Sequence, residues 1–271
     1  MPRIKKIESR ENKIIKRLQG LKSKRNRDKE NRFIVEGLRF VNDIPDSHPV
    51  ELYVCSETFS SSQAVSPYQE RADVILVPDS VFQLLSDTET PQGILAVCEK
   101  KETRFSAFTF ERDATAPAFF VVAEELQDPG NLGTLLRTAD ACGCSGIFLT
   151  DGCVDLYNPK VLRSTMGSLF HLPIITHCTT AEIHAFFTKN HIPMYATHLQ
   201  GDCLIYDLPL FQPCGIVIGN EGRGISKECI SLCDTLVKIP MIGQAESLNA
   251  SIAAGVILYE GVRQRLSNAK K

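Results

Sequence analysis

Runs of apolar residues separated by polar breaks recur along the chain, and their lengths and spacing predict an α/β protein. In the second half, near-continuous apolar runs of four or five residues predict buried strands, and the segments between them have helical spacing. The predicted strands are 119–123, 146–149, 172–175, 193–196, 216–219 and 236–240, and the predicted helices are 132–142, 161–170 and 247–266. Apolar strands that alternate with helices indicate a parallel sheet covered on both faces.

The first half has a shorter version of the same pattern. Its predicted strands are 50–55, 74–77 and 93–98, and its predicted helices are 11–21, with apolar residues every three or four positions, and 80–85. The stretch 100–117 is polar and charged and ends in a proline, which is typical of a linker. We therefore expect a small α/β domain at 1–105, a linker at 106–117 and a larger α/β domain at 118–271.

Charge is unevenly distributed along this chain of 271 residues, whose net charge is −2. Residues 1–40 contain 14 Lys and Arg against 5 Asp and Glu, a net of +9, and the remainder has a net of −11. The almost entirely charged stretch 22–32 is either a solvated turn or helix face, or a surface that contacts phosphates. The local excess favours the second interpretation.

The ends and the cysteines predict a protein of the reducing cytoplasm. No apolar run is long enough to span a membrane, and the basic start Met1–Lys6 is not followed by the apolar run of a secretory signal. Glu8 and Glu11 are unusual in a mitochondrial leader. The ten cysteines lack the paired spacing of zinc sites, so we expect reduced, buried thiols and no metal.

Ligands of parallel α/β sheets bind beyond the carboxyl ends of the strands, so the loops there are candidate sites. Asp128–Gly133 turns at Pro129-Gly130, offers Asn131 as a helix cap and is followed by Arg137. Gly219–Gly224 surrounds Glu221 with glycines that would let a ligand approach the backbone. Its spacing lacks both G-x-G-x-x-G and a Walker lysine, which argues against a dinucleotide or triphosphate site.

The third candidate loop runs from Ile239 to Ser251. We expect Ser247 to begin the closing helix and Asn249 to lie in its first turn, where free main-chain amides bind acceptor groups. Ordinary capping by Ser247 would explain the same residues. His198, just past a predicted strand, either lines a pocket or is a plain loop histidine.

In this order, the segments resemble the SpoU (TrmH-type) branch of the SPOUT RNA methyltransferases. The matching segments are Asn131–Gly133 with Arg137, Ile218–Gly222, Ile239–Met241 with Ser247–Ser251, and Arg163-Ser164 with Gly167. Ser168 departs from the alanine that many members have. The resemblance covers about residues 118–266. The basic start with Phe33–Gly37 is more loosely similar to the N-terminal RNA-binding module of the rRNA-modifying members, which resembles a small ribosomal protein.

The resemblance implies a deep trefoil knot, a homodimer packed through the knotted domain, and S-adenosylmethionine as cofactor. By position, it implies that the cofactor contacts Thr197, His198, Leu199, Gly219, Asn220, Gly222, Ile239, Met241, Ser247 and Leu248. The implied catalytic set is Arg137, Asn131, Glu221, Ser247 and Asn249. Because a guanidinium keeps its proton to about pH 12, we expect Arg137 to clamp a phosphate and lower the pKa of the hydroxyl rather than act as a base.

The implied reaction is methylation of a ribose 2′-hydroxyl in RNA. We expect 23S-type ribosomal RNA as substrate, because tRNA-modifying members often lack an N-terminal module of this size. A tRNA 2′-O-methyltransferase and a non-catalytic, knotted RNA-binding protein remain alternatives. The presence of Arg137, Glu221, Ser247 and Asn249 argues against the second alternative.

Overall fold

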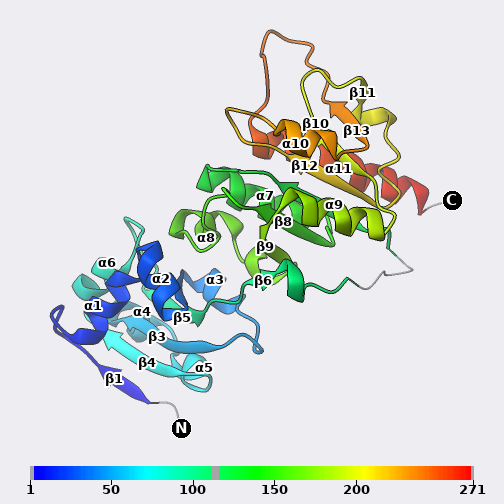
Figure 1. The fold of residues 1–271 in the computed structure, drawn as a ribbon. Coiled ribbons are helices and arrows are strands. Elements are labelled where there is room, and N and C mark those ends of the chain that lie inside the picture. Colours follow the sequence, from blue (N-terminus) through cyan, green and yellow to red (C-terminus); the bar gives the residue numbers. More distant parts are fainter. Residues whose placement is uncertain (1–2, 111–115, 270–271) are drawn as a thin grey trace. The chain divides into compact units, whose positions relative to one another are not determined.

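The computed structural model describes residues 3–110 and 116–269, whose contacts form two compact units (Figure 1). Unit 1 comprises Met1–Lys101 and Tyr157–Phe170, and unit 2 comprises Glu102–Leu156 and His171–Lys271. The chain first passes from unit 1 to unit 2 between Lys101 and Glu102, whereas the predicted N-terminal domain ends at residue 105. The return of Tyr157–Phe170 to unit 1 was not part of the prediction.

Unit 1 is built on a five-stranded mixed sheet in the order β1-β4-β3-β5-β2. The strands are β1 (Ile4–Lys6), β2 (Arg32–Glu36), β3 (Val50–Ser56), β4 (Asp73–Val77) and β5 (Ile94–Glu99). The helices are α1 (Lys13–Gly20), α2 (Lys24–Glu30), α3 (Leu38–Asn42), α4 (Glu57–Ser62), α5 (Ser66–Gln69), α6 (Asp79–Leu85) and α8 (Pro159–Thr165). The small N-terminal α/β domain is therefore confirmed as a fold.

Helix α1 shows how the sequence builds this unit. Asn12 caps the helix by accepting a hydrogen bond from the Ile14 N–H at 2.8 Å. Ile15 and Leu18 then fall on one face and are completely buried in the same cluster as Phe82 of α6. The predicted helix 11–21 is α1, and the charged stretch 22–32 contains α2. The buried apolar residues of α1 and β2 make residues 1–40 an integral part of the core.

Aromatic rings fasten the Tyr157–Phe170 segment within unit 1. The ring of Tyr157 lies 4.6 Å from that of Phe33, and the ring of Phe170 lies 5.8 Å from that of Phe40. The predicted helix 161–170 ends early, at Thr165, because Met166 and Gly167 adopt left-handed conformations. Gly167 has φ +97°, and a Cβ there would collide with the Asp43 carboxylate. The positive φ therefore favours glycine at this position.

Unit 2 contains an eight-stranded sheet in the order β11-β13-β10-β12-β7-β8-β9-β6, in which all pairs are parallel. The strands are β6 (Thr103–Arg104), β7 (Phe119–Ala123), β8 (Gly146–Thr150), β9 (Ile174–Cys178), β10 (Met194–Thr197), β11 (Cys203–Leu204), β12 (Cys214–Ile218) and β13 (Thr235–Lys238). The helices are α7 (Pro129–Ala141), α9 (Thr180–Lys189), α10 (Lys227–Ser231) and α11 (Ala250–Asn268). The predicted parallel α/β architecture is confirmed.

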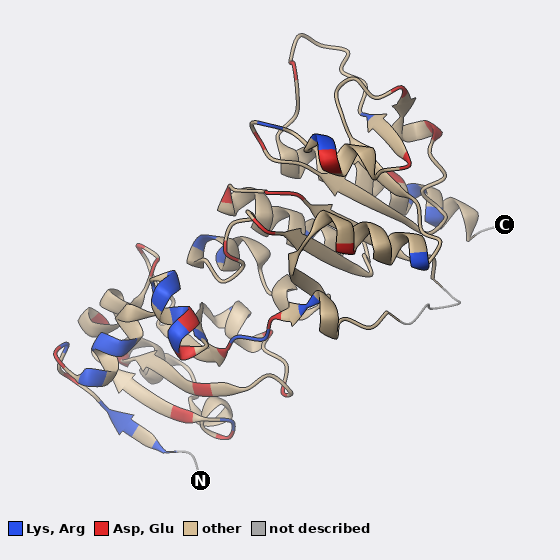
Figure 2. Cartoon of the chain, viewed as in Figure 1, with Lys and Arg blue, Asp and Glu red and all other residues tan. Residues whose placement is uncertain are grey.

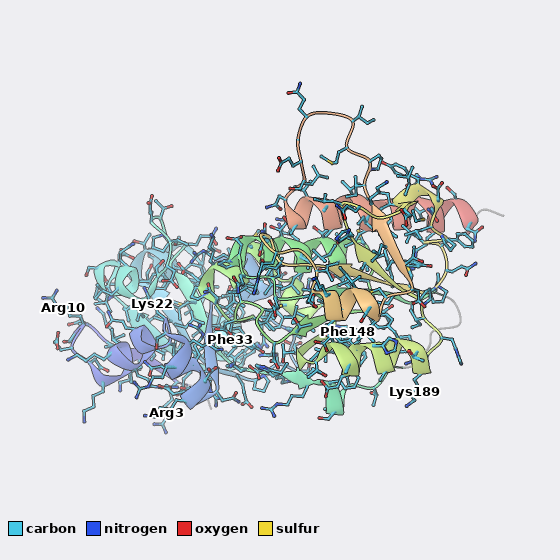
Figure 3. The ribbon with its side chains drawn as sticks, turned by 45° about the horizontal axis from the view of Figure 1, so that its top comes forward. Arg3, Arg10, Lys22, Phe33, Phe148 and Lys189 are labelled. Carbon is cyan, nitrogen blue, oxygen red and sulfur yellow. The ribbon has the colours of Figure 1, made fainter. Side chains whose placement is uncertain are left out.

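Strand β7 shows that helices cover both faces of this sheet. Its five residues are all buried. Phe120 belongs to a core cluster that includes Phe187 of α9 and Cys229 of α10, whereas the Phe119 ring lies 4.2 Å from the guanidinium of Arg265 on α11. Alternate residues of one strand thus face opposite helix layers, as expected of a strand inside a covered sheet (Figures 1 and 3).

The predicted linker 106–117 is described only in part, because 111–115 lie outside the described residues. Before that gap, the Phe108 ring lies 5.7 Å from Phe148, and the Phe110 ring lies 5.1 Å from Phe120. These two rings pack on the core of unit 2.

Two helix starts differ from the prediction, and a further helix was not predicted. Asp128, rather than Asn131, caps α7 and accepts a hydrogen bond from the Asn131 N–H at 2.8 Å, which suits a proline in the first turn. Asn249 caps α11, so Ser247 lies in the preceding loop instead of beginning the helix. Helix α9 was not predicted, although the capping box of Thr179 and Glu182 marks its start. Among the described helices, none is long and apolar enough to cross a membrane.

Candidate active site

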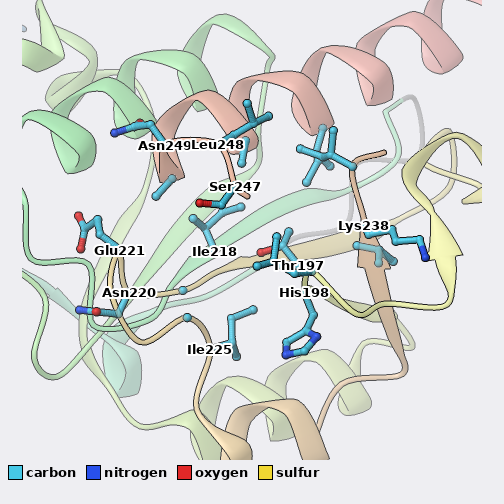
Figure 4. Close-up of a pocket in the computed structure, with 18 of the residues that line it drawn as sticks. Thr197, His198, Ile218, Asn220, Glu221, Ile225, Lys238, Ser247, Leu248 and Asn249 are labelled. Carbon is cyan, nitrogen blue, oxygen red and sulfur yellow. The ribbon is translucent and has the colours of Figure 1, made fainter. Parts of the chain in front are cut away.

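A cavity of about 710 Å³ lies where β10, β12 and β13 end and α11 begins (Figure 4). This is the edge of a parallel sheet at which ligands bind. All ten residues that the resemblance implied for the cofactor line the cavity, namely Thr197, His198, Leu199, Gly219, Asn220, Gly222, Ile239, Met241, Ser247 and Leu248. The structure thus brings the second and third motif loops together, and the contact of these residues with a cofactor stays a prediction.

The loop after β12 is held in shape by its own backbone and by Asn220. The main chains of Asn220 and Gly224 exchange two hydrogen bonds, at 3.0 and 2.9 Å. Asn220 Oδ1 accepts from the N–H groups of Gly222 and Arg223, both at 3.0 Å. A Cβ on Gly219 would lie 2.5 Å from the carbonyl carbon of Gly224. The folding back of this loop therefore requires glycine at position 219. The sequence had suggested a different reason, namely that the glycines let a ligand approach the backbone.

A chain of hydrogen bonds connects the three motifs. Glu221 Oε1 accepts from the Asn131 side-chain amide at 3.0 Å and from the Asp128 N–H at 2.9 Å. Asn131 Oδ1 in turn accepts from the Asn249 side-chain amide at 2.9 Å and from the Ser251 hydroxyl at 3.4 Å. Because both ends of the Asn131 carboxamide are engaged, its orientation is fixed. Three of the five predicted catalytic residues are thus joined in one network.

The negative charge of Glu221 suits its role as a hydrogen-bond acceptor in this network. Partial burial alone would raise the pKa of its carboxyl. Hydrogen bonds from Asn131 and from the N–H groups of Asp128 and Gln127 outweigh that effect, so its pKa lies below the ordinary value of 4.5. An ionised carboxylate accepts hydrogen bonds without donating any, as these three donors require. At neutral pH, Glu221 is therefore a charged anchor for the start of α7.

The other two predicted catalytic residues lie outside the network. Ser247 lines the cavity, is exposed, and forms no hydrogen bond within the described part of the chain. Arg137 is exposed on α7, does not line the cavity, and forms no ion pair or hydrogen bond with residues 3–110 or 116–269. Its guanidinium is thus available to a partner from outside the chain.

The sequence reasoning gave no role to two residues of this region, Ser251 of the third motif and Glu125. Ser251 is buried, and its hydroxyl donates to Asn249 Oδ1 at 2.7 Å in addition to contacting Asn131. Glu125 adopts φ +50°, and its carbonyl accepts from the Asn220 side-chain amide at 2.8 Å. The position of Ser251 two residues after Asn249 could have suggested the first contact, whereas nothing in the sequence marks the backbone of Glu125. Among the described residues, no group of three or more His, Cys, Asp and Glu is placed to hold a metal ion.

The comparisons with known proteins agree with the two units. Residues 118–259 match the SpoU rRNA Methylase family, and residues 12–96 match the MRM3-like substrate binding domain. The 23S rRNA (guanosine(2553)-2′-O)-methyltransferase of Bacillus subtilis is 34% identical over 258 residues, which span 94% of this chain and 98% of that protein. The 23S rRNA (uridine(2479)-2′-O)-methyltransferase of Streptomyces viridochromogenes is 36% identical over 199 residues, 72% of this chain and 68% of that one.

Among solved structures, the AdoMet-bound rRNA methyltransferase from Sinorhizobium meliloti superimposes with a TM-score of 0.84 at 29% identity, covering 96% of this chain and 98% of the other. The similarity therefore extends over both units, and the match to the methylase family covers the cavity and its three loops. This chain belongs to the SpoU rRNA methylase family.

Proposed function

We propose that this chain transfers a methyl group from S-adenosylmethionine to the 2′-hydroxyl of a ribose in large-subunit ribosomal RNA. One observation carries the proposal: the second and third family motifs line one cavity, and the network of Asn131, Glu221 and Asn249 ties the first motif to its edge. A relative that matches over 98% of its own length is named as a 23S rRNA 2′-O-methyltransferase.

The cavity suits this cofactor in size and in chemistry. Its volume of about 710 Å³ falls in the range of small-molecule sites, roughly 300–1,000 Å³. Apolar side chains suited to an adenine ring line it, namely Ile218, Ile225, Ile239, Leu248 and Ile257. Thr197 and Ser247 add hydroxyls for the polar part of the molecule. When bound, S-adenosylmethionine supplies an electrophilic methyl group on a sulfonium.

The residues of the chain contribute position and charge. Glu221 holds the start of α7 and the carboxamide of Asn131, and Asn249 joins that carboxamide to the start of α11. The loops that surround the acceptor ribose are therefore set before substrate binds, which reduces the entropic cost of aligning the reactants. Arg137 would hold the phosphate beside the acceptor ribose, where its charge stabilises the oxyanion that develops at the 2′ position.

Unit 1 would attract the RNA backbone. Lys and Arg residues lie along α1 and α2 (Figure 2), and Arg3 and Arg10 extend away from unit 1 (Figure 3). Basic surfaces bind RNA phosphates without regard to sequence. This supports a substrate-binding role for the N-terminal domain 1–105, and we propose that residues 118–271 carry out the methyl transfer.

We propose that two copies of the chain dimerise through unit 2. Helix α11 exposes Ile252, Val256, Tyr259 and Leu266, which are 54%, 36%, 56% and 62% accessible. Their spacing of four, three and seven residues places them on one side of the helix. An apolar stripe of this kind on a soluble protein marks a contact surface. We further propose two features that the family resemblance implies. The first is a trefoil knot in unit 2, and the second is a cytoplasmic location, which the ten free thiols support.

The experiment that tests this function is a comparison of 2′-O-methylated positions in total RNA from cells with and without the gene. We expect one position in large-subunit ribosomal RNA to lose its methyl group. A change confined to tRNA would overturn the substrate assignment. Titration calorimetry with S-adenosylmethionine distinguishes the methyltransferase from a non-catalytic RNA-binding protein. A protein that has lost its cofactor site would show no heat of binding.

A further inference from the structure

The basic side chains of Arg223 and Lys238 line the cavity, and Arg223 belongs to the same loop as Glu221. Among the described residues, the side chain of Arg223 has one partner, Glu125, whose Oε2 accepts from Arg223 Nη2 at 2.6 Å. The two side chains are 67% and 44% accessible. An ion pair this exposed contributes little to the stability of a fold.

The shape of the loop does not depend on this ion pair. Asn220 holds the loop by accepting from the N–H groups of Gly222 and Arg223 and by donating to the Glu125 carbonyl. None of these three bonds uses the side chain of Glu125 or Arg223, so all three survive replacement of either side chain. The guanidinium and the carboxylate are therefore free for another task.

The backbone of Glu125 gives a second, independent indication. Its φ of +50° is one that residues with a side chain rarely adopt. Two hydrogen bonds hold it there, from its N–H to Thr150 Oγ1 at 2.9 Å and from Asn220 to its carbonyl. Uncommon backbone conformations of this kind cluster at functional sites. Here the conformation belongs to the residue that pairs with an arginine at the edge of the cavity.

We propose that Arg223 is an RNA-positioning residue, and that its guanidinium leaves Glu125 to bind a backbone phosphate of the acceptor strand. The inference rests on the proposed function and adds a specific contact to it. A planar guanidinium binds phosphate through paired hydrogen bonds. Glu125 holds the side chain at the edge of the cavity while RNA is absent and competes with the phosphate when RNA arrives.

The test compares Arg223→Gln and Glu125→Gln in the full-length protein. The probe is large-subunit ribosomal RNA transcribed in vitro, which carries no modification. For Arg223→Gln we expect Kd and KM for this RNA to rise about tenfold or more. The slope of log Kd against log salt should fall by about 0.7, the value for one phosphate contact on a single strand. The Kd for S-adenosylmethionine, measured by calorimetry, should not change.

Glu125→Gln separates this role from a structural one. It removes the competitor and keeps the guanidinium, so the Kd for RNA should stay the same or fall. Arg223→Lys should restore most of the salt dependence, and Lys189→Gln, on α9 (Figure 3), controls for the loss of one exposed charge. If both Gln variants at the ion pair weakened RNA binding equally, the pair would be a brace and the inference would be wrong.

Two further outcomes would also overturn the inference. A rise in the Kd for S-adenosylmethionine with unchanged RNA binding would assign Arg223 to the cofactor carboxylate. Wild-type RNA binding by Arg223→Gln would remove Arg223 from the RNA surface. Failure of the proposed function is distinguishable from both, because in that case the wild-type protein itself would methylate no ribosomal RNA.

Discussion

At the scale of single residues, the site combines groups that are fixed by hydrogen bonds with an arginine, Arg137, that forms none with the described residues. Asn131 and Glu221 are engaged on all sides by hydrogen bonds from within unit 2. Arg137, on the same helix as Asn131, has none within the described part of the chain. This contrast separates residues whose replacement disturbs the site from a residue whose replacement removes a contact to substrate.

We expect Arg137→Ala to abolish methyl transfer while the Kd for S-adenosylmethionine and the midpoint of thermal unfolding stay close to the wild-type values. The reason is that Arg137 is exposed and unpaired within residues 3–110 and 116–269, and such surface changes alter stability by about 0.5 kcal/mol or less. Arg104→Ala, another exposed arginine of unit 2, is the matched control. Equal loss of cofactor binding and methylation would instead assign a structural role to Arg137.

Glu221 makes a prediction about pH. Because its pKa is lowered by folding, its stabilising effect is fully present above the ordinary value of 4.5 and is lost as the pH falls through the folded-state value. The difference in Tm between wild type and Glu221→Gln should therefore be constant between pH 6 and 8 and shrink below about pH 4.5. Glu246→Gln, in an exposed loop, should show no such trend. A Tm difference that did not shrink at all as the pH fell below 4.5 would contradict the charged anchor.

At the scale of elements, internal ion pairs divide the cations of α1 and α2 into two groups. Arg17 is held by Glu30 and Glu51, and Lys16 by Glu11. In α2, by contrast, Lys24, Arg25 and Lys29 are exposed and form no ion pair with other described residues. Asp28, which shares their side of the helix, is paired with Lys100 at 2.6 Å. Part of the excess of +9 in residues 1–40 is therefore available to phosphates where α2 faces solvent.

We expect the triple variant Lys24→Gln, Arg25→Gln, Lys29→Gln to lower the slope of log Kd for RNA against log salt by about 2, at roughly 0.7 for each phosphate contact. Cofactor affinity should not change. The control is a triple variant of exposed cations in unit 2, Arg104→Gln, Lys189→Gln and Lys227→Gln. Equal slopes for the two triple variants would place the RNA elsewhere. Deletion of residues 1–40 is a poorer test, since it removes β1, β2 and buried core residues.

The elements also show what the pattern of the sequence encodes. Strand β7 was predicted with its observed bounds, because five consecutive buried apolar residues leave little choice of register. The two-residue strands β6 and β11 were missed, since they are too short for any periodicity. Motif order located the cavity, whose lining depends on loops at strand ends. It could not reveal that Arg137 lies apart from the network or that Gly219 serves a fold-back, because both depend on distances between segments far apart in the chain.

At the scale of the whole molecule, the exposed stripe of α11 predicts assembly. Tyr259→Glu places a charge in the middle of the stripe, so we expect the protein to change from dimer to monomer in light scattering coupled to gel filtration. Thr188→Glu, which adds the same charge on exposed α9, should remain dimeric. A wild-type monomer, or a dimer that survives both changes at micromolar concentration, would place the interface on another surface.

The path of the chain between the two units has a consequence for how such proteins can be recombined. The chain leaves unit 1 after Lys101, returns for Tyr157–Phe170 and leaves again. A single crossover after the first hundred residues would remove Phe33 and Phe40 but keep Tyr157 and Phe170. The foreign module would then lack the segment that packs against it in its own protein, and Tyr157 and Phe170 would lose their aromatic partners. New RNA specificities built on this catalytic unit must therefore be grafted in two pieces, the second of them inside the region that matches the methylase family.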